Sequence, residues 1–254
     1  MQHEQIIHKS PAGTGPLKQA YPDLIELAAH DLQAPLRKLG VFTERLINKY
    51  IPLPDQEAGQ YIKRIHTCLN QMKSLIDDLA GYSAATPEKM VYTICEPGPM
   101  IRKLTAELVS VEEVGQVEIR MTELPVINGD KAQLELVFKK ILENSFRFRK
   151  PGVPLTIEIN ATELSPSERM VLDLPAKKFY ELSFADNGIG FSEGDSKKIF
   201  EPLVRLHGRS EFAGNGLGLA WVKRIIENHG GIAYAEGNRA IGARIILVIP
   251  ENGD

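Results

Sequence analysis

The chain has 254 residues, 43% of them hydrophobic and 25% charged, which is enough for one large or two modest domains of a globular protein. Its 30 basic and 33 acidic side chains leave a net charge of -3, which argues against nucleic-acid binding. The sequence lacks a membrane-length apolar run, a signal peptide and a Cys-x-x-Cys pair, so we expect a cytoplasmic chain without membrane contact of its own, although a longer parent protein could be membrane-attached.

Residues 1–17 are predicted to form a flexible leader, because Pro and Gly recur in them. A helix is expected next, around residues 24–39. His30 lies roughly 200° around this helix from Ala28, away from its apolar stripe, and is therefore predicted to be exposed and reactive. The stripe consists of Leu24, Ala28, Leu32, Leu36 and Leu39.

A second long helix is predicted between Asp55 and Ser83, after the segment Ile51–Pro54 ends the first. Its apolar residues alternate in steps of four and three, which is the heptad pattern of a helical bundle. They are Ala58, Ile62, Ile65, Leu69, Met72, Ile76 and Leu79. Two such helices cannot bury both apolar flanks alone, so residues 18–86 are expected to form an antiparallel hairpin that dimerises as a four-helix bundle.

The heptad pattern stops near residues 84–89, and residues 90–254 mix short strands with helices. This pattern predicts an α/β sandwich, with helices on one face of a mixed sheet. The segment Ser165–Pro175 is predicted to be a polar hairpin insertion without chemistry. Strands are expected at residues 90–95, 116–121, 155–162, 179–185, 231–236 and 243–249, and helices at residues 97–114, 130–149 and 217–228.

Three clusters in this second half favour a nucleotide site. In the first, Asp186 follows an apolar strand and precedes Gly188 and Gly190. A carboxylate at a strand end can accept a hydrogen bond from the exocyclic amine of adenine, and glycines let a flat ring approach the backbone. An ordinary Asx turn is the alternative interpretation of this cluster taken alone.

The other two clusters suit phosphate. The glycine-rich segment Gly214–Leu219 opens a predicted helix, whose N-terminal N-H groups attract anions. Asn144 and Arg147 lie three residues apart on one helix face, where a carboxamide for Mg²⁺ and a guanidinium for phosphate can act together. A solvated basic helix end is the simpler interpretation of Arg147 and its neighbours.

In order and spacing, these residues resemble the motifs of sensor histidine kinases, in the variant of phytochrome-like members. The segment His30–Leu36 resembles the H-box, Asn144 with Arg147 the N-box, Asp186–Gly190 and Gly214–Gly218 the two glycine boxes, and Phe200–Leu203 the F-box. The resemblance implies a dimerisation and phosphotransfer hairpin at residues 18–86. It also implies a catalytic ATP-binding domain with the histidine kinase/Hsp90-like ATPase fold at residues 90–254.

The resemblance further implies a role for each matched residue. His30 is the expected phosphoacceptor, and Asp31 is expected to hold its Nδ1 proton so that Nε2 attacks the γ-phosphorus of ATP. Asn144 is the expected Mg²⁺ ligand, Arg147 a phosphate contact and Asp186 the adenine acceptor. The remaining expected contacts are Gly188 and Gly190 in the base pocket and Gly214, Gly216 and Gly218 in the lid and phosphate-binding helix.

The implied function is that of an ATP- and Mg²⁺-dependent protein histidine kinase. It would autophosphorylate His30 and pass the phosphoryl group to an aspartate in the receiver domain of a response regulator. Arg205 or Arg209 is expected to add positive charge from the lid. Two alternatives stay open, an ATPase of the same nucleotide fold and a catalytically silent dimeric scaffold that binds nucleotide.

Four positions depart from the family pattern. Lys140 stands where related ATPases carry the glutamate that activates water, so hydrolysis by that route is not expected. In the lid, Leu203 replaces the second phenylalanine of the F-box, and Asn215 replaces a threonine or serine. Ala34 follows His30 by four residues and cannot position a hydrolytic water, which argues against phosphatase activity.

The other histidines are expected to be incidental exposed residues without a role. They are His3, His8, His66, His207 and His229.

Overall fold

The computed structural model describes residues 32–33, 36–45, 59–60, 62–70, 72–73, 76, 90–109, 115–206, 212 and 215–252. The chain divides into two compact units, one formed by residues 8–85 and one that contains residues 86–254. His30, Asp31, Ala34, Arg209 and Gly214 lie outside the described residues, so their predicted roles stay predictions.

In the first unit, residues 36–45 and 62–70 are helical. Leu36 from the first helical segment forms a buried cluster with Leu69 and Ile76 from the second. Other apolar residues of the predicted stripes remain exposed within the single chain, namely Leu32, Leu39, Ile65 and Met72. The hairpin therefore buries one flank of its apolar pattern and leaves the other uncovered.

The second unit contains a mixed five-stranded sheet in the order β2-β4-β5-β7-β6 and a separate antiparallel pair of β1 and β3. The strand β2 pairs parallel with β4, and the other neighbours in the larger sheet are antiparallel. The strands are β1 (Tyr92–Cys95), β2 (Val117–Met121), β3 (Ile127–Asp130), β4 (Leu155–Glu163), β5 (Phe179–Asp186), β6 (Ile232–Asn238) and β7 (Gly242–Pro250).

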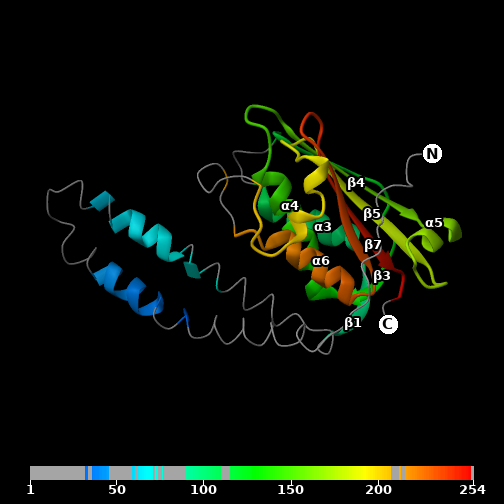
Figure 1. Ribbon diagram of the computed structural model, residues 1–254, viewed down its shortest axis with the longest axis horizontal. Helices are drawn as coiled ribbons and strands as arrows, with labels where there is room; N and C mark the ends of the chain where they lie inside the picture. The colour runs from blue at the N-terminus through cyan, green and yellow to red at the C-terminus, as the bar shows by residue number, and fades with distance from the viewer. Residues whose placement is uncertain are drawn as a thin grey trace. The chain divides into compact units, whose positions relative to one another are not determined.

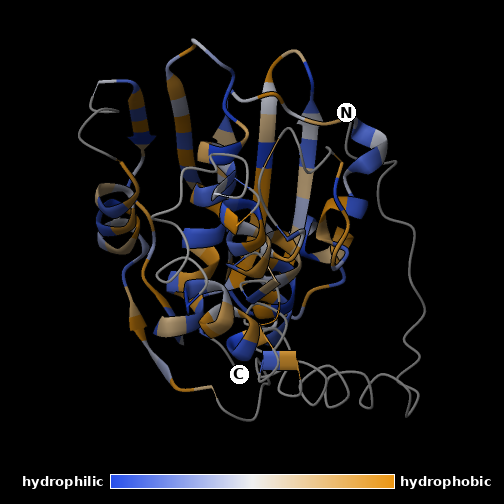
Figure 2. Ribbon diagram, turned by 90° about the vertical axis from the view of Figure 1, so that its left-hand side faces the viewer, coloured by the Kyte–Doolittle hydropathy of each residue, from blue (hydrophilic) through white to orange (hydrophobic). Residues whose placement is uncertain are grey.

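Three helices cover one face of this sheet (Figure 1). They are α3 (Pro97–Leu108), α4 (Lys131–Arg147) and α6 (Gly218–Asn228). Residues along the strands alternate between hydrophobic and hydrophilic in Figure 2, as expected for strands with one face on a core. Two short 3-10 helices, Glu193–Asp195 and Lys198–Phe200, follow β5.

The helix α4 packs on the sheet because its apolar residues recur every three or four positions and so lie on one face of the helix. Its buried side chains are Leu134, Val137, Phe138, Ile141, Leu142 and Ser145. The ring of Phe138 lies 5.9 Å from that of Phe184 on β5, which fixes the helix over this central strand.

Asp130 begins α4 and joins three segments of the unit. Its Oδ1 accepts a hydrogen bond from the amide of Gln133 at 3.1 Å and so caps the helix. Its Oδ2 accepts one from the amide of Val91 at 2.9 Å, just before β1. The start of α4 is thereby tied to the segment that enters the second unit.

The prediction of a polar hairpin at Ser165–Pro175 was wrong for the first half of this segment, where the helix α5 (Pro166–Val171) forms instead. Ser165 and Glu168 make a reciprocal capping box, a pattern that the Ser-x-x-Glu spacing already contained. Leu172 and Leu174 then pack against Val248 and Phe179, on the opposite face of the sheet from α4. The insertion therefore covers part of the outer face.

Two further expectations needed correction. The strand β3 was not predicted, because Ile-Asn-Gly-Asp reads as a turn and forms a strand only through pairing with β1. The helix expected at residues 97–114 ends at Leu108. Other boundaries differ from the predictions by one or two residues, as helix and strand ends commonly do.

His229 is not an incidental exposed histidine. Only 1% of its surface is accessible, and both ring nitrogens have hydrogen-bond partners at the end of α6. The sequence could not indicate this, because one partner is the amide of Asp130, distant along the chain.

Among the described residues, no helix is both long and apolar enough to cross a membrane.

Replacement of the α4 cap tests its contribution to stability. Asp130→Ala is expected to lower the free energy of unfolding by about 0.5 to 2 kcal/mol, because the amide of Gln133 loses its acceptor. Asp130→Asn keeps an oxygen acceptor for the amide of Gln133, since asparagine caps helices about as well as aspartate, but it presents an NH₂ donor to the amide of Val91 and so measures the loss of that second bond alone. Urea unfolding of the three proteins would measure the difference, and equal stability of Asp130→Ala and the wild type would contradict the role of the cap.

Candidate nucleotide-binding site

Asp186 ends β5 next to the C-terminal end of α4. Its Oδ1 accepts hydrogen bonds from the amides of Gly188 at 2.9 Å and Ala243 at 3.3 Å. Its Oδ2 accepts one from the hydroxyl of Ser145 on α4, at 3.0 Å. An ionised carboxylate offers about four acceptor positions. One acceptor position therefore remains on Oδ2, which fits the exocyclic amine of adenine.

The glycines after Asp186 are required by close backbone approaches. A Cβ added at Gly188 would lie 2.6 Å from the carbonyl oxygen of Phe148, at the end of α4. Gly190 has a φ of +60°, and its added Cβ would lie 2.2 Å from the carbonyl oxygen of Asn238. Any side chain at these two positions would displace the loop that forms the wall beside Asp186.

Ser145 is a residue of the site that the sequence reasoning missed. It occupies a core position of α4, four residues after Ile141, and is buried. A hydroxyl at such a position needs a hydrogen-bond partner, because burying it unpaired is costly. This polar residue in the apolar stripe was the available signal, although its partner Asp186 is distant in the sequence.

Asn144 lies at the other end of the site, beside the start of α6. A Cβ added at Gly218 would lie 3.8 Å from Nδ2 and 3.9 Å from Oδ1 of Asn144. The Asn144 carboxamide therefore lies beside the first residue of α6, with room for about a methyl group between them. The structure brings together two residues that are far apart in the sequence. Asn144 was predicted to bind Mg²⁺, and Gly218 was predicted to lie in the phosphate-binding start of the helix.

The loop before α6 is bonded to the F-box segment. Gly216 has a φ of +71°, and its carbonyl oxygen accepts a hydrogen bond from the amide of Leu203 at 2.9 Å. Leu203 itself has a φ of +66°, which is uncommon for a residue with a side chain, and its side chain is exposed. Leu203, which replaces phenylalanine at this F-box position, thus forms a turn that is hydrogen-bonded to Gly216 in the second glycine cluster.

The predicted cationic contacts differ in placement. Arg147 is exposed at the end of α4. Arg205 donates from Nη2 to the carbonyl oxygen of Phe212 at 2.6 Å, so this part of its guanidinium is bonded to the backbone before α6. Lys140 forms an ion pair with Glu143 at 3.4 Å on α4. No three His, Cys, Asp or Glu side chains cluster as a preformed metal site within the described part of the chain.

Burial raises the pKa of the Asp186 carboxyl above its ordinary value of 3.8, and the hydrogen bonds from Gly188, Ser145 and Ala243 oppose that rise. The folded protein therefore holds the proton of Asp186 more tightly than the unfolded chain does. Because of this, the free energy of unfolding contributed by Asp186 falls as the pH rises from the unfolded pKa through the folded one. At neutral pH the ionised carboxylate costs stability.

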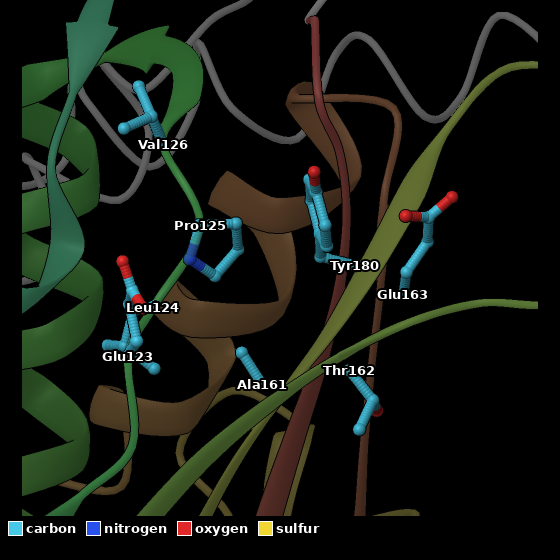
Figure 3. Close-up of a pocket in the computed structure, with 8 residues that line it drawn as sticks. All are labelled: Glu123, Leu124, Pro125, Val126, Ala161, Thr162, Glu163 and Tyr180. Carbon is cyan, nitrogen blue, oxygen red and sulfur yellow. The ribbon is translucent and has the colours of Figure 1, made fainter.

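A pocket of about 380 Å³ lies at the opposite end of β5 from Asp186 (Figure 3). The hydroxyl of Tyr180 in this pocket donates to Glu251 at 3.1 Å. None of the predicted site residues lines the pocket. Its lining residues are Glu123, Leu124, Pro125, Val126, Ala161, Thr162, Glu163 and Tyr180.

Two protein families match this chain in the order that the sequence motifs indicate. Residues 23–87 match the His Kinase A (phospho-acceptor) domain. Residues 129–253 match the histidine kinase-, DNA gyrase B-, and HSP90-like ATPase. The chain belongs to the sensor histidine kinases. The predicted fold, a helical phosphoacceptor region followed by an α/β ATPase domain, is confirmed for this chain.

The chain is similar to a phytochrome-like protein and to a signal transduction histidine-protein kinase/phosphatase. It is 30% identical to the phytochrome-like protein Cph1 of Synechocystis over 224 residues. This alignment covers 88% of the chain and 28% of Cph1. It is 26% identical over 243 residues to the signal transduction histidine-protein kinase/phosphatase MprB of Mycobacterium ulcerans, covering 89% of this chain and 43% of MprB. The chain thus spans less than half of the length of either relative.

Among solved structures, full-length ShkA in complex with AMPPNP shares the fold. It matches with a TM-score of 0.65 and 21% identity, over 92% of this kinase and 46% of ShkA.

Asp186→Asn separates stability from binding. The amide oxygen can keep the hydrogen bonds from Gly188 and Ala243, and the uncharged group removes the cost of burying a carboxylate, so stability at pH 7 should be equal or higher. The amide nitrogen, however, would meet the adenine amine as a second donor. ATP binding is expected to weaken by about ten- to a hundredfold, from the loss of a charged hydrogen bond.

Calorimetric titration with ATP and thermal unfolding from pH 4 to pH 8 would test this. The wild type should gain stability relative to Asp186→Asn as the pH falls toward the folded pKa of Asp186. Unchanged ATP affinity in the variant would exclude Asp186 as the base acceptor.

Proposed function

We propose that the chain is an ATP-dependent protein histidine kinase that phosphorylates its own His30 and passes the phosphoryl group to a response-regulator aspartate. The observation that carries this proposal is the placement of Asn144 and Ser145. The carboxamide of Asn144 lies beside the start of α6, and the hydroxyl of Ser145 donates a hydrogen bond to the carboxylate of Asp186. One helix thus aligns a base acceptor and a phosphate-binding helix end, in a chain that also has a phosphoacceptor domain.

At the base end, we propose that Asp186 accepts a hydrogen bond from the exocyclic amine of ATP. Adenine presents an amine there, whereas guanine presents a carbonyl oxygen that the carboxylate would repel. A site built around a buried acceptor rejects a base without the matching donor. The kinase should therefore use ATP in preference to GTP.

At the phosphate end, we propose that the carboxamide oxygen of Asn144 is a ligand of Mg²⁺ and that Gly218 directs the N-terminus of α6 at the phosphates. Mg²⁺ would neutralise charge on the transferring phosphoryl group. Arg147 is exposed and close in sequence to Asn144, which supports a phosphate contact from solvent. Gly214 and Gly216 are proposed to shape the lid before α6.

The chemical step assigned to His30 is an in-line displacement at the γ-phosphorus. Its neutral Nε2 supplies the electron pair of the new P-N bond, the P-O bond to the leaving group breaks, and ADP departs. Imidazole has an ordinary pKa near 6.5, so most of it is neutral at neutral pH. We assign to Asp31 the role of holding the Nδ1 proton, which leaves the Nε2 lone pair directed at phosphorus.

Homodimerisation is the expected state of the hairpin. The exposed apolar residues Ile65 and Met72 are one heptad apart, as are the buried residues Leu69 and Ile76. A soluble helix with a second apolar stripe of this kind is typical of a bundle completed by another copy. Because the chain has a phosphoacceptor domain, we propose that the receiver domain of a response regulator takes the phosphoryl group from it.

The silent scaffold remains the second candidate, because Leu203 and Asn215 change the lid. An ATPase without phosphotransfer is disfavoured because Lys140 stands at the position where related ATPases carry the glutamate that activates water.

The decisive assay incubates the wild type and His30→Gln with γ-labelled ATP and Mg²⁺. The wild type is expected to retain label that is acid-labile and alkali-stable, as a phosphoramidate is, and His30→Gln is expected to retain none while binding ATP normally. His66→Gln is the matched control and should be labelled like the wild type. Label on His30→Gln would exclude His30 as acceptor, and ATP binding without any label would favour the scaffold.

The double variant Ile65→Glu/Met72→Glu tests the dimer. Charges on the exposed stripe should oppose its burial against a second copy, so the variant is expected at the monomer mass of 28.2 kDa and the wild type at twice that mass. Light scattering after size-exclusion chromatography measures both. Thr67→Glu, at an exposed position of the same helix, should stay dimeric. A dimeric double variant would refute the assignment of this stripe as the interface.

A further inference from the structure

His229 at the end of α6 is buried, and both of its ring nitrogens make hydrogen bonds. Its Nε2 lies 3.0 Å from the backbone nitrogen of Asp130, which can only donate. Its Nδ1 lies 2.8 Å from the carbonyl oxygen of Ile225, which can only accept. The two contacts together require a neutral ring with the proton on Nδ1.

The surroundings of His229 are built to admit this ring. A Cβ added at Gly129 would lie 3.1 Å from Nε2 and 2.7 Å from Leu134 Cδ1, so glycine leaves the space that the imidazole needs. Tyr92 packs edge-on against the ring, with centroids 5.7 Å apart. Burial lowers the pKa of His229, and Asp130 is the charged group that opposes this effect.

The helices joined by His229 are the two that hold the proposed nucleotide site. At this end, the last turn of α6 is bonded to the first residue before α4. At the other end, Gly218 of α6 meets Asn144 of α4. The helices are therefore antiparallel neighbours, and a hydrogen bond at one end limits how far one helix can slide or rotate relative to the other.

We propose that His229 is a positioning residue for nucleotide binding, which sets the approach of Gly218 to Asn144 by fixing the opposite ends of α6 and α4 through Asp130. The proposal rests on the proposed function, because it assumes that this meeting point receives the phosphates of ATP. His229 does not contact the nucleotide in this account. It acts through the rigid helices that run from it to the site.

Two amide substitutions separate the contacts of His229. Glutamine can present an oxygen where Nε2 lies and so keep an acceptor for the amide of Asp130. Asparagine can present its NH₂ group where Nδ1 lies and so keep the donor to Ile225, but it is too short to reach Asp130. The proposal assigns the positioning effect to the bond with Asp130, so only asparagine should impair ATP binding.

The experiment measures the dissociation constant of ATP in the presence of Mg²⁺ for the full chain by calorimetry. His229→Asn is expected to bind ATP at least about tenfold more weakly than the wild type, and His229→Gln within about threefold of it. Leu164→Val, in the core cluster on the outer face of the sheet, controls for general loss of stability and should also bind within threefold. All proteins are compared below their unfolding temperatures.

An independent measurement is the tautomer of His229 in nitrogen NMR spectra. A protonated Nδ1 and a bare Nε2 from pH 6 to pH 8 are expected. Equal ATP affinity for His229→Asn and Leu164→Val, or a proton on Nε2, would overturn the proposal. If the wild type binds ATP but carries no label on His30, the proposed function fails while this comparison still holds. If the wild type does not bind ATP, both fail.

Discussion

The packing of α4 on β5 is the constraint on which the catalytic unit depends. Phe138 meets Phe184 across this contact, and the same helix then presents Ser145 to Asp186 and Asn144 to Gly218. Because a helix is rigid and rises about 1.5 Å per residue, its core residues fix where its polar residues lie. Its first residues are held by the Asp130 cap and by His229 at the end of α6. If the site binds nucleotide as proposed, its affinity depends on contacts spread along the whole helix.

In the proposed site, Asp186 lowers the stability of the fold and offers an acceptor for the base. A half-buried carboxylate is unfavourable in the folded state, as its raised pKa indicates, and Gly188, Ala243 and Ser145 compensate only in part. The same partial satisfaction leaves an acceptor position on Oδ2 for a ligand. A fully satisfied carboxylate would be more stable and would have nothing to offer the base.

The apolar residues of the hairpin unit are only partly buried within the single chain. Leu36, Leu69 and Ile76 hold its helices together, whereas Ile65, Met72 and Leu39 remain exposed. Its apolar residues are thus divided between an intrachain core and a surface suited to a second copy. The two units carry separate parts of the proposed reaction, since the proposed nucleotide site lies in the second unit and the phosphoacceptor is expected in the first.

The sequence by itself determined the family, the heptad hairpin, the α/β unit and the positions of Asn144, Asp186 and the glycines, because periodicity and local motifs lie within short stretches of chain. Only the tertiary structure decided which distant residues meet. Ser145 gains a role through Asp186, β3 becomes a strand through β1, and His229 is buried through Asp130. Those partners lie tens of residues away, and a hydrogen bond between them depends on how helices and strands pack, which local propensity does not specify.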